Sequence, residues 1–188
     1  MNNYQTNRNF LVVGCGGLGC YIIEGLLRMN VKSIKVCDPD VFSTSNLNRQ
    51  LYSLPKNINE YKVDVASQRA KDLNYQNEFI TYKECFNESM LENVDVVIDA
   101  LDNIESRLLL EDACSKHKLP LIHGAVENST YQVGVIMPYS NVLHNIYKDI
   151  NEPKDKSTNV VTVLTCASKQ LHLALSEIEE YFEINELD

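Results

Sequence analysis

The chain has 188 residues, of which 44% are hydrophobic and 23% charged, and both values are typical of one globular domain, here expected to span residues 1–188. The formal net charge of -9, without any lysine- or arginine-rich tract, argues against a nucleic-acid partner. No apolar run approaches the roughly 20 residues of a membrane span, and the polar start MNNYQTNRNF does not resemble a signal peptide, so we expect a cytoplasmic protein without membrane contact.

The first part of the chain is typical of a strand, a glycine turn, a helix and a second strand. The apolar run at 10–13 predicts a buried strand that stops at a glycine. Four of the seven glycines lie close together here: Gly14, Gly16, Gly17 and Gly19. Such a cluster favours a tight turn that brings backbone N–H groups and a helix N-terminus up to a phosphate. A helix over 21–29 and a strand at 33–37 follow, and Asp38 ends that strand, where dinucleotide-binding folds place the carboxylate that holds ribose hydroxyls.

The remaining elements alternate in the same way, after a long polar loop rich in Asn, Ser and Pro. The pattern predicts helices at 61–73, 88–92 and 104–117, strands at 79–82, 94–100 and 119–122, an added antiparallel strand at 130–137, a flexible connection at 151–158 and a last helix at 163–182. We therefore expect an α/β fold, Rossmann-like and doubly wound, with a mainly parallel sheet, an added antiparallel strand and a C-terminal helix. Its ligand should lie beyond the carboxyl ends of strands one, two and four.

Charged and polar side chains converge on the glycine turn in such a fold. The polar loop supplies Asn46, Asn48 and Arg49, the next helix begins near Lys62, and the fourth strand leads to Asp102. An arginine can bind phosphate oxygens bidentately, a lysine can neutralise charge on a triphosphate, and a carboxylate facing it can hold Mg²⁺. Hydride transfer needs an open nicotinamide pocket more than added positive charge. The set therefore favours phosphate chemistry, with an NAD-dependent oxidoreductase as an alternative.

Several motifs follow one another along nearly the whole chain. They are Gly14-Cys-Gly-Gly-Leu-Gly19, Asp38-Pro-Asp40, Ser45-Asn-Leu-Asn-Arg-Gln50, Lys62, Asp99-Ala-Leu-Asp-Asn103 with Arg107, and Gly124-Ala125. Together they resemble the ThiF/MoeB/HesA family, the bacterial relatives of ubiquitin-activating enzymes. The resemblance implies that ATP is bound by Gly14, Gly16, Gly17, Gly19, Asp38, Asp40, Ser45, Asn46, Leu47, Asn48, Arg49, Lys62, Asp102 and Asn103. It implies that Arg49, Lys62 and Asp102 act in catalysis, with Asp102 as the Mg²⁺ ligand.

The reaction that the resemblance implies is adenylation of the C-terminal glycine carboxylate of a small ubiquitin-like sulfur carrier protein. The carrier would be similar to ThiS and end in Gly-Gly, pyrophosphate would be released, and the pathway would be thiamine or related sulfur-containing cofactor biosynthesis. A C-terminal carboxyl group has a pKa of about 3.3 to 3.7, so it is ionised at neutral pH and the reaction needs no general base. The resemblance also implies a homodimer, formed through the last helix and the strands near Thr130.

The chain departs from the family in its cysteines and its N-terminus. Many relatives bind zinc with two C-x-x-C pairs, but the first pair's place reads Val142-Leu-His-Asn145 and no second pair follows, so zinc is predicted absent. The six dispersed cysteines are expected to be buried small hydrophobes, including Cys166 in the last helix. Arg8 is a doubtful substitute for the arginine that an N-terminal arm lends to the neighbour's ATP in related dimers. These departures leave adenylation intact and argue against later sulfur transfer by this chain.

Simpler roles and other functions stay open at this point. Arg49 could be a surface salt-bridge partner, Lys62 a solvated residue at a helix start, and Asp102 the N-cap of the helix that follows. Asp99 and Arg107 could form an ion pair, and His123 is expected to be a strand-end histidine with satisfied hydrogen bonds. The chain could instead be a catalytically impaired nucleotide-binding partner subunit. A dehydratase acting on a tRNA-bound carboxylate is disfavoured by the acidic net charge.

Overall fold

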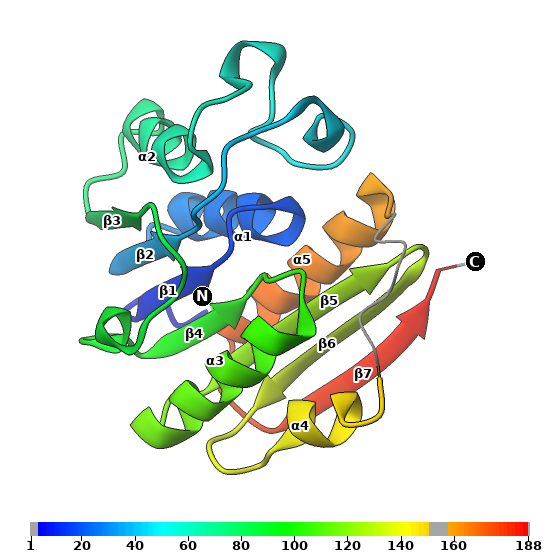
Figure 1. The fold of residues 1–188 in the computed structure, drawn as a ribbon. Helices are drawn as coiled ribbons and strands as arrows, with labels where there is room; N and C mark the ends of the chain where they lie inside the picture. The colour runs from blue at the N-terminus through cyan, green and yellow to red at the C-terminus, as the bar shows by residue number, and fades with distance from the viewer. Residues whose placement is uncertain (1–3, 151–157, 188) are drawn as a thin grey trace.

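The computed structural model describes residues 4–150 and 158–187 (Figure 1). A seven-stranded sheet has the order β3-β2-β1-β4-β5-β6-β7. Its strands are β1 (Asn9–Val13), β2 (Ser33–Cys37), β3 (Glu78–Tyr82), β4 (Val96–Asp99), β5 (Leu121–Glu127), β6 (Thr130–Ile136) and β7 (Tyr181–Glu186). The first five pair in parallel, and β6 and β7 are added antiparallel. The predicted fold class is confirmed.

Helices cover both faces of the sheet (Figure 1). They are α1 (Gly17–Arg28), α2 (Lys62–Asp72), α3 (Ile104–His117), α4 (Val142–Tyr147) and α5 (Val160–Leu175). Side chains of α1, α2 and α5 belong to the apolar core on one face, and those of α3 and α4 to the core on the other. Within β1, Phe10 and Val12 face the first core while Leu11 and Val13 face the second, so one strand contributes to both. In the described part of the chain, none of the helices is both long and apolar enough to cross a bilayer.

The C-terminal part differs from the expectation of one helix over 163–182. Helix α5 spans Val160–Leu175, Ser176 has an extended backbone, and the chain returns as the edge strand β7. Phe182 packs against Gly134 of β6, where a Cβ atom would lie only 2.5 Å from the Phe182 ring. The strand is therefore stabilised by its pairing with β6, which a local pattern of acidic residues does not reveal.

Two further segments need comment against the sequence-based expectations. The short helix α4, Val142–Tyr147, was not expected, because six residues are too few for a clear helical period. The predicted flexible connection at 151–158 falls almost wholly on residues 151–157, outside the described residues. Its last residue, Thr158, forms a parallel bridge with Asn128.

Candidate active site

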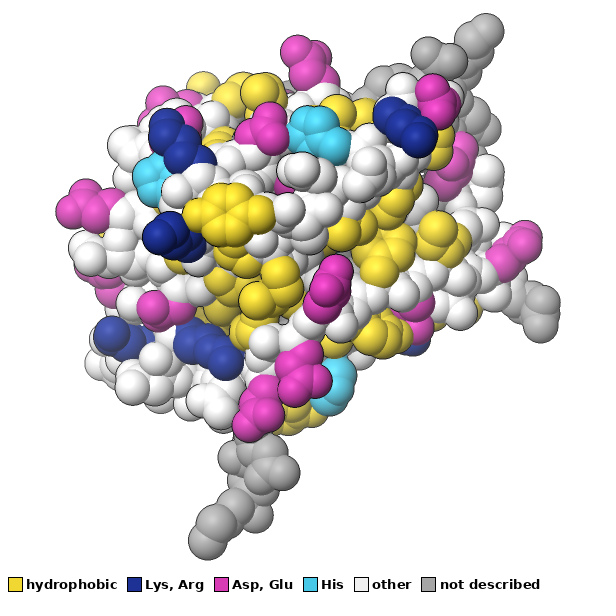
Figure 2. Space-filling model, turned by 90° about the horizontal axis from the view of Figure 1, so that it is seen from below, with side chains coloured by type: hydrophobic (Ala, Val, Ile, Leu, Met, Phe, Trp, Pro, Cys, Tyr) yellow, Lys and Arg dark blue, Asp and Glu magenta, His cyan; other side chains and the backbone are white. Residues whose placement is uncertain are grey.

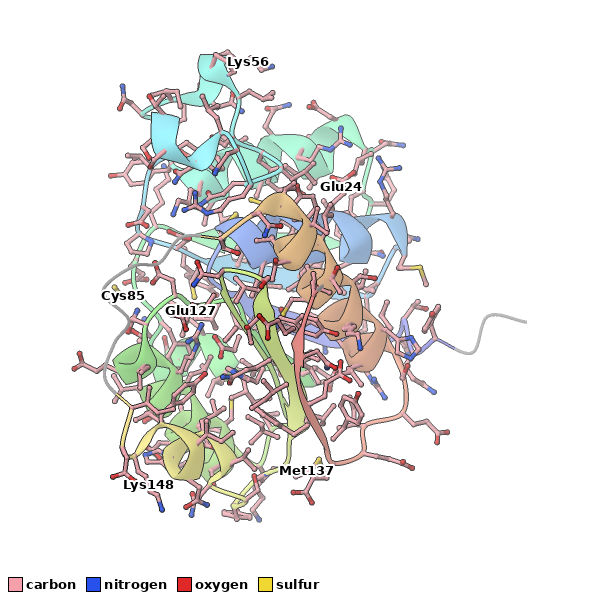
Figure 3. The ribbon with its side chains drawn as sticks, turned by 90° about the vertical axis from the view of Figure 1, so that its right-hand side faces the viewer. Glu24, Lys56, Cys85, Glu127, Met137 and Lys148 are labelled. Atoms are coloured by element: carbon pink, nitrogen blue, oxygen red, sulfur yellow. The ribbon has the colours of Figure 1, made fainter. Side chains whose placement is uncertain are left out.

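A cavity of about 680 Å³ lies at the carboxyl ends of the parallel strands, within the usual size range of ligand pockets. Predicted site residues that line it are Gly14, Gly16, Gly17, Asp38, Asp40, Arg49, Lys62, Asp102 and Asn103. Figure 3 labels two other lining residues, Cys85 after β3 and Glu127 at the end of β5. The cavity thus has one half at the glycine turn and another along the β5–β6 hairpin and the end of α4. The position expected from strands one, two and four agrees with the first half.

Five predicted residues do not line the cavity. They are Gly19, Ser45, Asn46, Leu47 and Asn48. Gly19 packs inside the turn, while Asn46 accepts a hydrogen bond from Ser43 N at 2.9 Å and so shapes the loop. Leu47 is 38% exposed, and the Asn48 side chain accepts a bond from Arg49. In this structure Ser45 and Asn48 accept hydrogen bonds from Arg49 and so help to position it.

The glycine turn keeps one wall of the cavity bare. Gly14 has φ +101°, and a Cβ atom there would lie 2.5 Å from Ala100 O. By contrast, a Cβ atom at Gly17 would meet Val163 only at 3.6 Å, an ordinary van der Waals distance. The protein's own packing therefore requires Gly14 but not Gly17. Because Gly17 begins α1 and lines the cavity, its missing side chain leaves the helix N-terminus open to an anionic group.

Asp38 and Lys62, both buried, form a charged cluster with the exposed Asp40 beside this turn. Asp38 is 6% exposed, and its two carboxylate oxygens accept hydrogen bonds from Cys15 N at 2.7 Å and Asp40 N at 2.8 Å. Lys62 is 7% exposed, and its Nζ donates to Asp40 Oδ2 at 2.8 Å and lies 3.7 Å from Asp38 Oδ2. The interpretation of Lys62 as a solvated residue at a helix start is therefore wrong.

Charge in this cluster is set by burial and by the neighbouring groups. Burial raises the pKa of Asp38, while Lys62 and two backbone N–H groups oppose the rise. Burial alone would lower the pKa of Lys62, but the Asp38 and Asp40 carboxylates outweigh it and the pKa is raised. Lys62 is therefore a cation at neutral pH, held in the cavity wall before any ligand arrives.

Arg49 and Asp102 lie on the cavity from two different segments. Nη1 of Arg49 donates to Ser45 O at 2.8 Å and to Asn48 Oδ1 at 2.9 Å, so its partners are neutral and an anionic ligand could serve as its counter-ion. Asp102 is exposed at the cavity. The N-cap of α3 is Asn103, whose Oδ1 accepts from Ser106 N at 2.8 Å, so the alternative that assigned this cap to Asp102 is wrong.

The residues present fit a magnesium nucleotide. Mg²⁺ is usually held by one or two carboxylates together with substrate phosphates, so Asp102 would suffice with a bound triphosphate. In the described part of the chain, no three His, Cys, Asp or Glu side chains gather as a metal site of their own. Residues 142–145, where relatives are expected to carry a C-x-x-C pair, form the first turn of α4.

Sequence reasoning did not assign several lining residues to the site, among them Gln50 and Cys85. Gln50 is 8% exposed, and its Oε1 has no hydrogen-bond partner among the described residues. Gln50 is the last residue of the motif that begins at Ser45, and this position in the motif could have identified it as a site residue. Cys85 is exposed, contrary to the expectation that the cysteines are buried, and its polar neighbour Glu84 was the signal. The other five cysteines are buried, as expected, and burial raises the pKa of Cys166 to about 12.

A buried polar network lies beneath the β5 half of the cavity. Asp99 Oδ2 contacts His123 Nδ1 at 2.7 Å and Arg107 Nε at 3.6 Å, which confirms the ion pair and the satisfied histidine. His123 does not end its strand as expected, because β5 continues to Glu127 through its pairing with β6. Gln170 Nε2 of α5 donates to Asp99 O at 2.7 Å. Arg8 donates to Ala174 O and Ser176 O at the end of α5, so its guanidinium is engaged within its own chain.

Comparison with known proteins assigns the family. The ThiF family model matches residues 5–175. A SAMP-activating enzyme E1 from Haloferax volcanii is 31% identical to this chain over 147 residues, which is 76% of this chain and 54% of that protein. The adenylyltransferase and sulfurtransferase MOCS3 from Culex quinquefasciatus is 39% identical over 119 residues, which is 61% of this chain and 27% of that protein. The chain therefore spans about half or less of the length of these relatives. The fold is similar to that of E. coli MccB with ATP, at a TM-score of 0.74 and 18% identity, over 95% of this chain and 64% of that chain. This chain belongs to the ThiF family.

Proposed function

We propose that this chain is an ATP- and Mg²⁺-dependent adenylyltransferase. Its substrate would be the C-terminal glycine carboxylate of a small ubiquitin-like sulfur carrier protein similar to ThiS, in thiamine or related sulfur-containing cofactor biosynthesis. The observation that carries the proposal is the buried Lys62, held as a cation by Asp38 and Asp40 in the same cavity as Arg49 and Asp102. Membership of the ThiF family supports it.

The geometry supports a division of labour among the nucleotide-side residues. The ribose hydroxyls can donate to Asp38, and the phosphates can bind Arg49, Lys62 and the backbone N–H groups at the start of α1. Mg²⁺ held by Asp102 would supply neutralising charge on the phosphates. The charged side chains that line the cavity between the end of β2 and the start of α3 thus fit a bound nucleoside triphosphate.

The carboxyl substrate would enter the other half of the cavity, along β5 and β6. One oxygen of its C-terminal carboxylate forms a bond to the α-phosphorus, the bond between that phosphorus and the bridging oxygen breaks, and pyrophosphate leaves with the electron pair. The carboxylate is already ionised at neutral pH, so no side chain has to remove a proton. The chain's own contribution is to align the two reactants and to stabilise charge on the phosphates.

The test is ATP–pyrophosphate exchange with Mg²⁺ and a carrier that ends in Gly-Gly from the same genome. We expect carrier-dependent exchange that falls by about 10²-fold or more in Arg49→Ala and in Asp102→Ala, because each removes charge stabilisation at the reacting phosphates. Asp112→Ala, which removes an exposed carboxylate from α3, the helix that follows Asp102, serves as the matched control and should stay near wild type. Exchange that is unaffected by both site variants would refute the assigned site.

A nucleotide-binding partner subunit is the second candidate. It is supported by two departures from the family pattern: Arg8 is engaged at the end of α5 within its own chain, and residues 142–145 hold no C-x-x-C pair. Measurable ATP binding without ATP–pyrophosphate exchange would favour this candidate. A second protein whose addition restores the exchange would then be the catalytic subunit. Binding of NADH in preference to ATP would instead favour an oxidoreductase.

We also infer one domain over residues 1–188 and a homodimer. The sharing of β1 between both apolar cores supports a single folding unit. The dimer would form through α5 and the strands near Thr130. Exposed apolar side chains on α5, Val161 and Leu164, and on β7, Tyr181 and Ile184, support such a contact.

A further inference from the structure

A buried carboxylate of α3 binds the first turn of helix α4. Glu111 of α3 is 3% exposed. Its Oε1 accepts a hydrogen bond from Leu143 N at 2.9 Å, and its Oε2 accepts one from His144 N at 3.0 Å and contacts His144 Nδ1 at 2.7 Å. The N-cap residue of α4, Asn141, makes no side-chain cap hydrogen bond. Glu111 therefore caps α4 from a different helix.

This contact fixes the first turn of a helix whose other anchors are the side chains of Leu143 and Tyr147 in the apolar core. A helix of six residues is far below the length at which an isolated helix is stable, so its position depends on tertiary contacts. A carboxylate as buried as Glu111 is costly unless hydrogen bonds satisfy it, and here three nitrogen atoms surround it. Removing the carboxylate would leave the N–H groups of Leu143 and His144 without their acceptor. The place of α4 on α3 is thus linked to Glu111.

The other end of α4 carries Tyr147 into the cavity wall. Tyr147 is 7% exposed; its hydroxyl donates to Gln132 Oε1 at 3.0 Å and lies 3.5 Å from His123 Nε2. The Arg107 guanidinium lies 6.0 Å from the centre of the Tyr147 ring. Gln132, Arg107 and Tyr147 all line the β5 half of the cavity. Figure 3 shows α4 beside α3, with the exposed Lys148 at its outer end.

We propose that Glu111 is a positioning residue that docks α4 on α3 and thereby holds Tyr147 in the wall of the substrate half of the cavity. Glu111 touches no reactant itself. Its effect is on the affinity for the carboxyl substrate and not on ATP, because the ATP half is built from the glycine turn, Lys62 and Arg49. The effect on affinity rests on the proposed function; the docking of α4 does not.

The first experiment is amide hydrogen exchange followed by NMR, which needs no activity. Glu111→Gln keeps the side-chain size but offers only one oxygen, and we expect faster exchange at Leu143 and His144 by about tenfold or more, with loss of the ring contact between Tyr147 and His123. Asp112→Asn is the matched control, since Asp112 approaches only His144 Nε2, at 3.6 Å, and caps no backbone group. Unchanged exchange at both amides in Glu111→Gln and in Glu111→Ala would overturn the proposal.

The second experiment measures steady-state exchange kinetics. In Glu111→Gln we expect KM for the carrier to rise by about tenfold, whereas KM for ATP changes by less than about twofold. In a Tyr147→Ala background the same substitution should add almost nothing, because the two residues act through one contact. Equal effects on both substrates, or full additivity, would indicate a merely structural role and overturn the proposal. A wild type without exchange would refute the proposed function, and amide exchange would still decide the docking of α4.

Discussion

Two glycines of the turn after β1 serve different physical purposes. A Cβ atom at Gly19 would lie 2.0 Å from Gly14 O, so the turn itself has no room for a side chain there. At Gly17 the nearest atom would be Val163 Cγ1 at 3.6 Å, which a methyl group tolerates. The protein's own packing therefore does not require glycine at position 17, and the remaining reason for it is the cavity that Gly17 lines. A ligand group that approaches the start of α1 would give that reason.

We therefore predict opposite outcomes for alanine at these two positions. Gly17→Ala should fold with unchanged or slightly higher stability, because alanine favours a helix, but its ATP affinity should fall by about tenfold as the methyl group blocks the phosphate. Gly19→Ala should lose about 2 kcal/mol or more of stability through overpacking. Thermal unfolding and calorimetric titration with ATP measure both effects. Wild-type ATP affinity in Gly17→Ala would contradict a phosphate at this place.

The thiol of Cys85 should report directly on occupation of the cavity. It is the exposed one of the six cysteines, all of which lie in the described ranges, and it lines the cavity. Burial raises the pKa of Cys37 and of Cys166 to about 12, so those thiols stay protonated at neutral pH. Iodoacetamide should label Cys85 alone in the native protein, and saturating ATP should slow the labelling several-fold. Mass spectrometry of the modified peptides measures this, with Cys85→Ser as the control; ATP-insensitive labelling would contradict a nucleotide beside it.

Among the elements, α1 and α2 are joined by one carboxylate. Glu24 of α1 contacts Arg69 of α2, with Nη2 to Oε1 at 2.8 Å and Nε to Oε2 at 2.9 Å, and also Arg28 at 2.7 Å. Tyr52 from the preceding loop donates to Glu24 Oε2 at 3.3 Å. Because α2 begins with Lys62, this contact helps to fix the helix that carries the catalytic lysine proposed above.

The stability that Glu24 supplies should depend on pH in a defined direction. The hydrogen bond from Arg69 is the main cause that holds the pKa of Glu24 below its ordinary value. The folded state therefore favours the carboxylate, so its contribution is present above the unfolded pKa and is lost as pH falls through the lowered folded pKa. Glu24→Gln should cost about 1 kcal/mol at pH 7 after allowance for solvent screening, and the difference from wild type should vanish in acid.

Urea unfolding of both proteins from pH 7 down to about pH 3 measures this difference. Glu60→Gln, which removes an exposed carboxylate from the loop before α2, is the control and should show almost no difference at any pH. If the lower unfolding free energy of Glu24→Gln persists unchanged in acid, side-chain packing and not charge holds the two helices together.

Much of the fold was predictable because its parallel core consists of local signals. The strands at 10–13 and 33–37 end at a glycine and an aspartate, and each leads to a helix, the second after a long polar loop. Strand β7 and helix α4 were not predictable in this way. The first depends on pairing with β6, and the second on Glu111 of α3, so both are stabilised by contacts distant in sequence.

The candidate site was predictable to a similar degree. Arg49, Lys62 and Asp102 come from three separate segments and all line one cavity, because the carboxyl ends of parallel strands meet at one edge of the sheet. Asn48 does not line the cavity, and its side chain accepts a hydrogen bond from Arg49. Gln50, two residues later, does line the cavity. Both follow the short helical turn at Thr44–Asn46, which shapes this loop. That turn is a property of the folded loop, which residue types alone do not specify.

For the whole molecule, several exposed apolar side chains lie outside the cavity lining. Figure 2 shows hydrophobic side chains grouped on the face seen from below, on the side where Figure 1 has α4, with charged side chains around them. Tyr181 and Ile184 of the edge strand β7 are 42% and 58% exposed. On α5, Val161 and Leu164 are 61% and 44% exposed. Apolar groups of this kind mark contact surfaces between proteins.

The homodimer inferred above places the second copy on these two elements. Leu164→Glu and Ile184→Glu should each shift the protein toward monomer at micromolar concentration, because a carboxylate would be buried against an apolar surface. Tyr139→Glu is the matched control: Tyr139 is 64% exposed but belongs to the β6–α4 loop, outside the inferred contact, so its mass should stay that of the wild type. Light scattering measures the mass, and thermal unfolding checks that each variant is folded. A wild-type monomer at micromolar concentration would remove the dimer and leave the apolar side chains of α5 and β7 for a different protein partner.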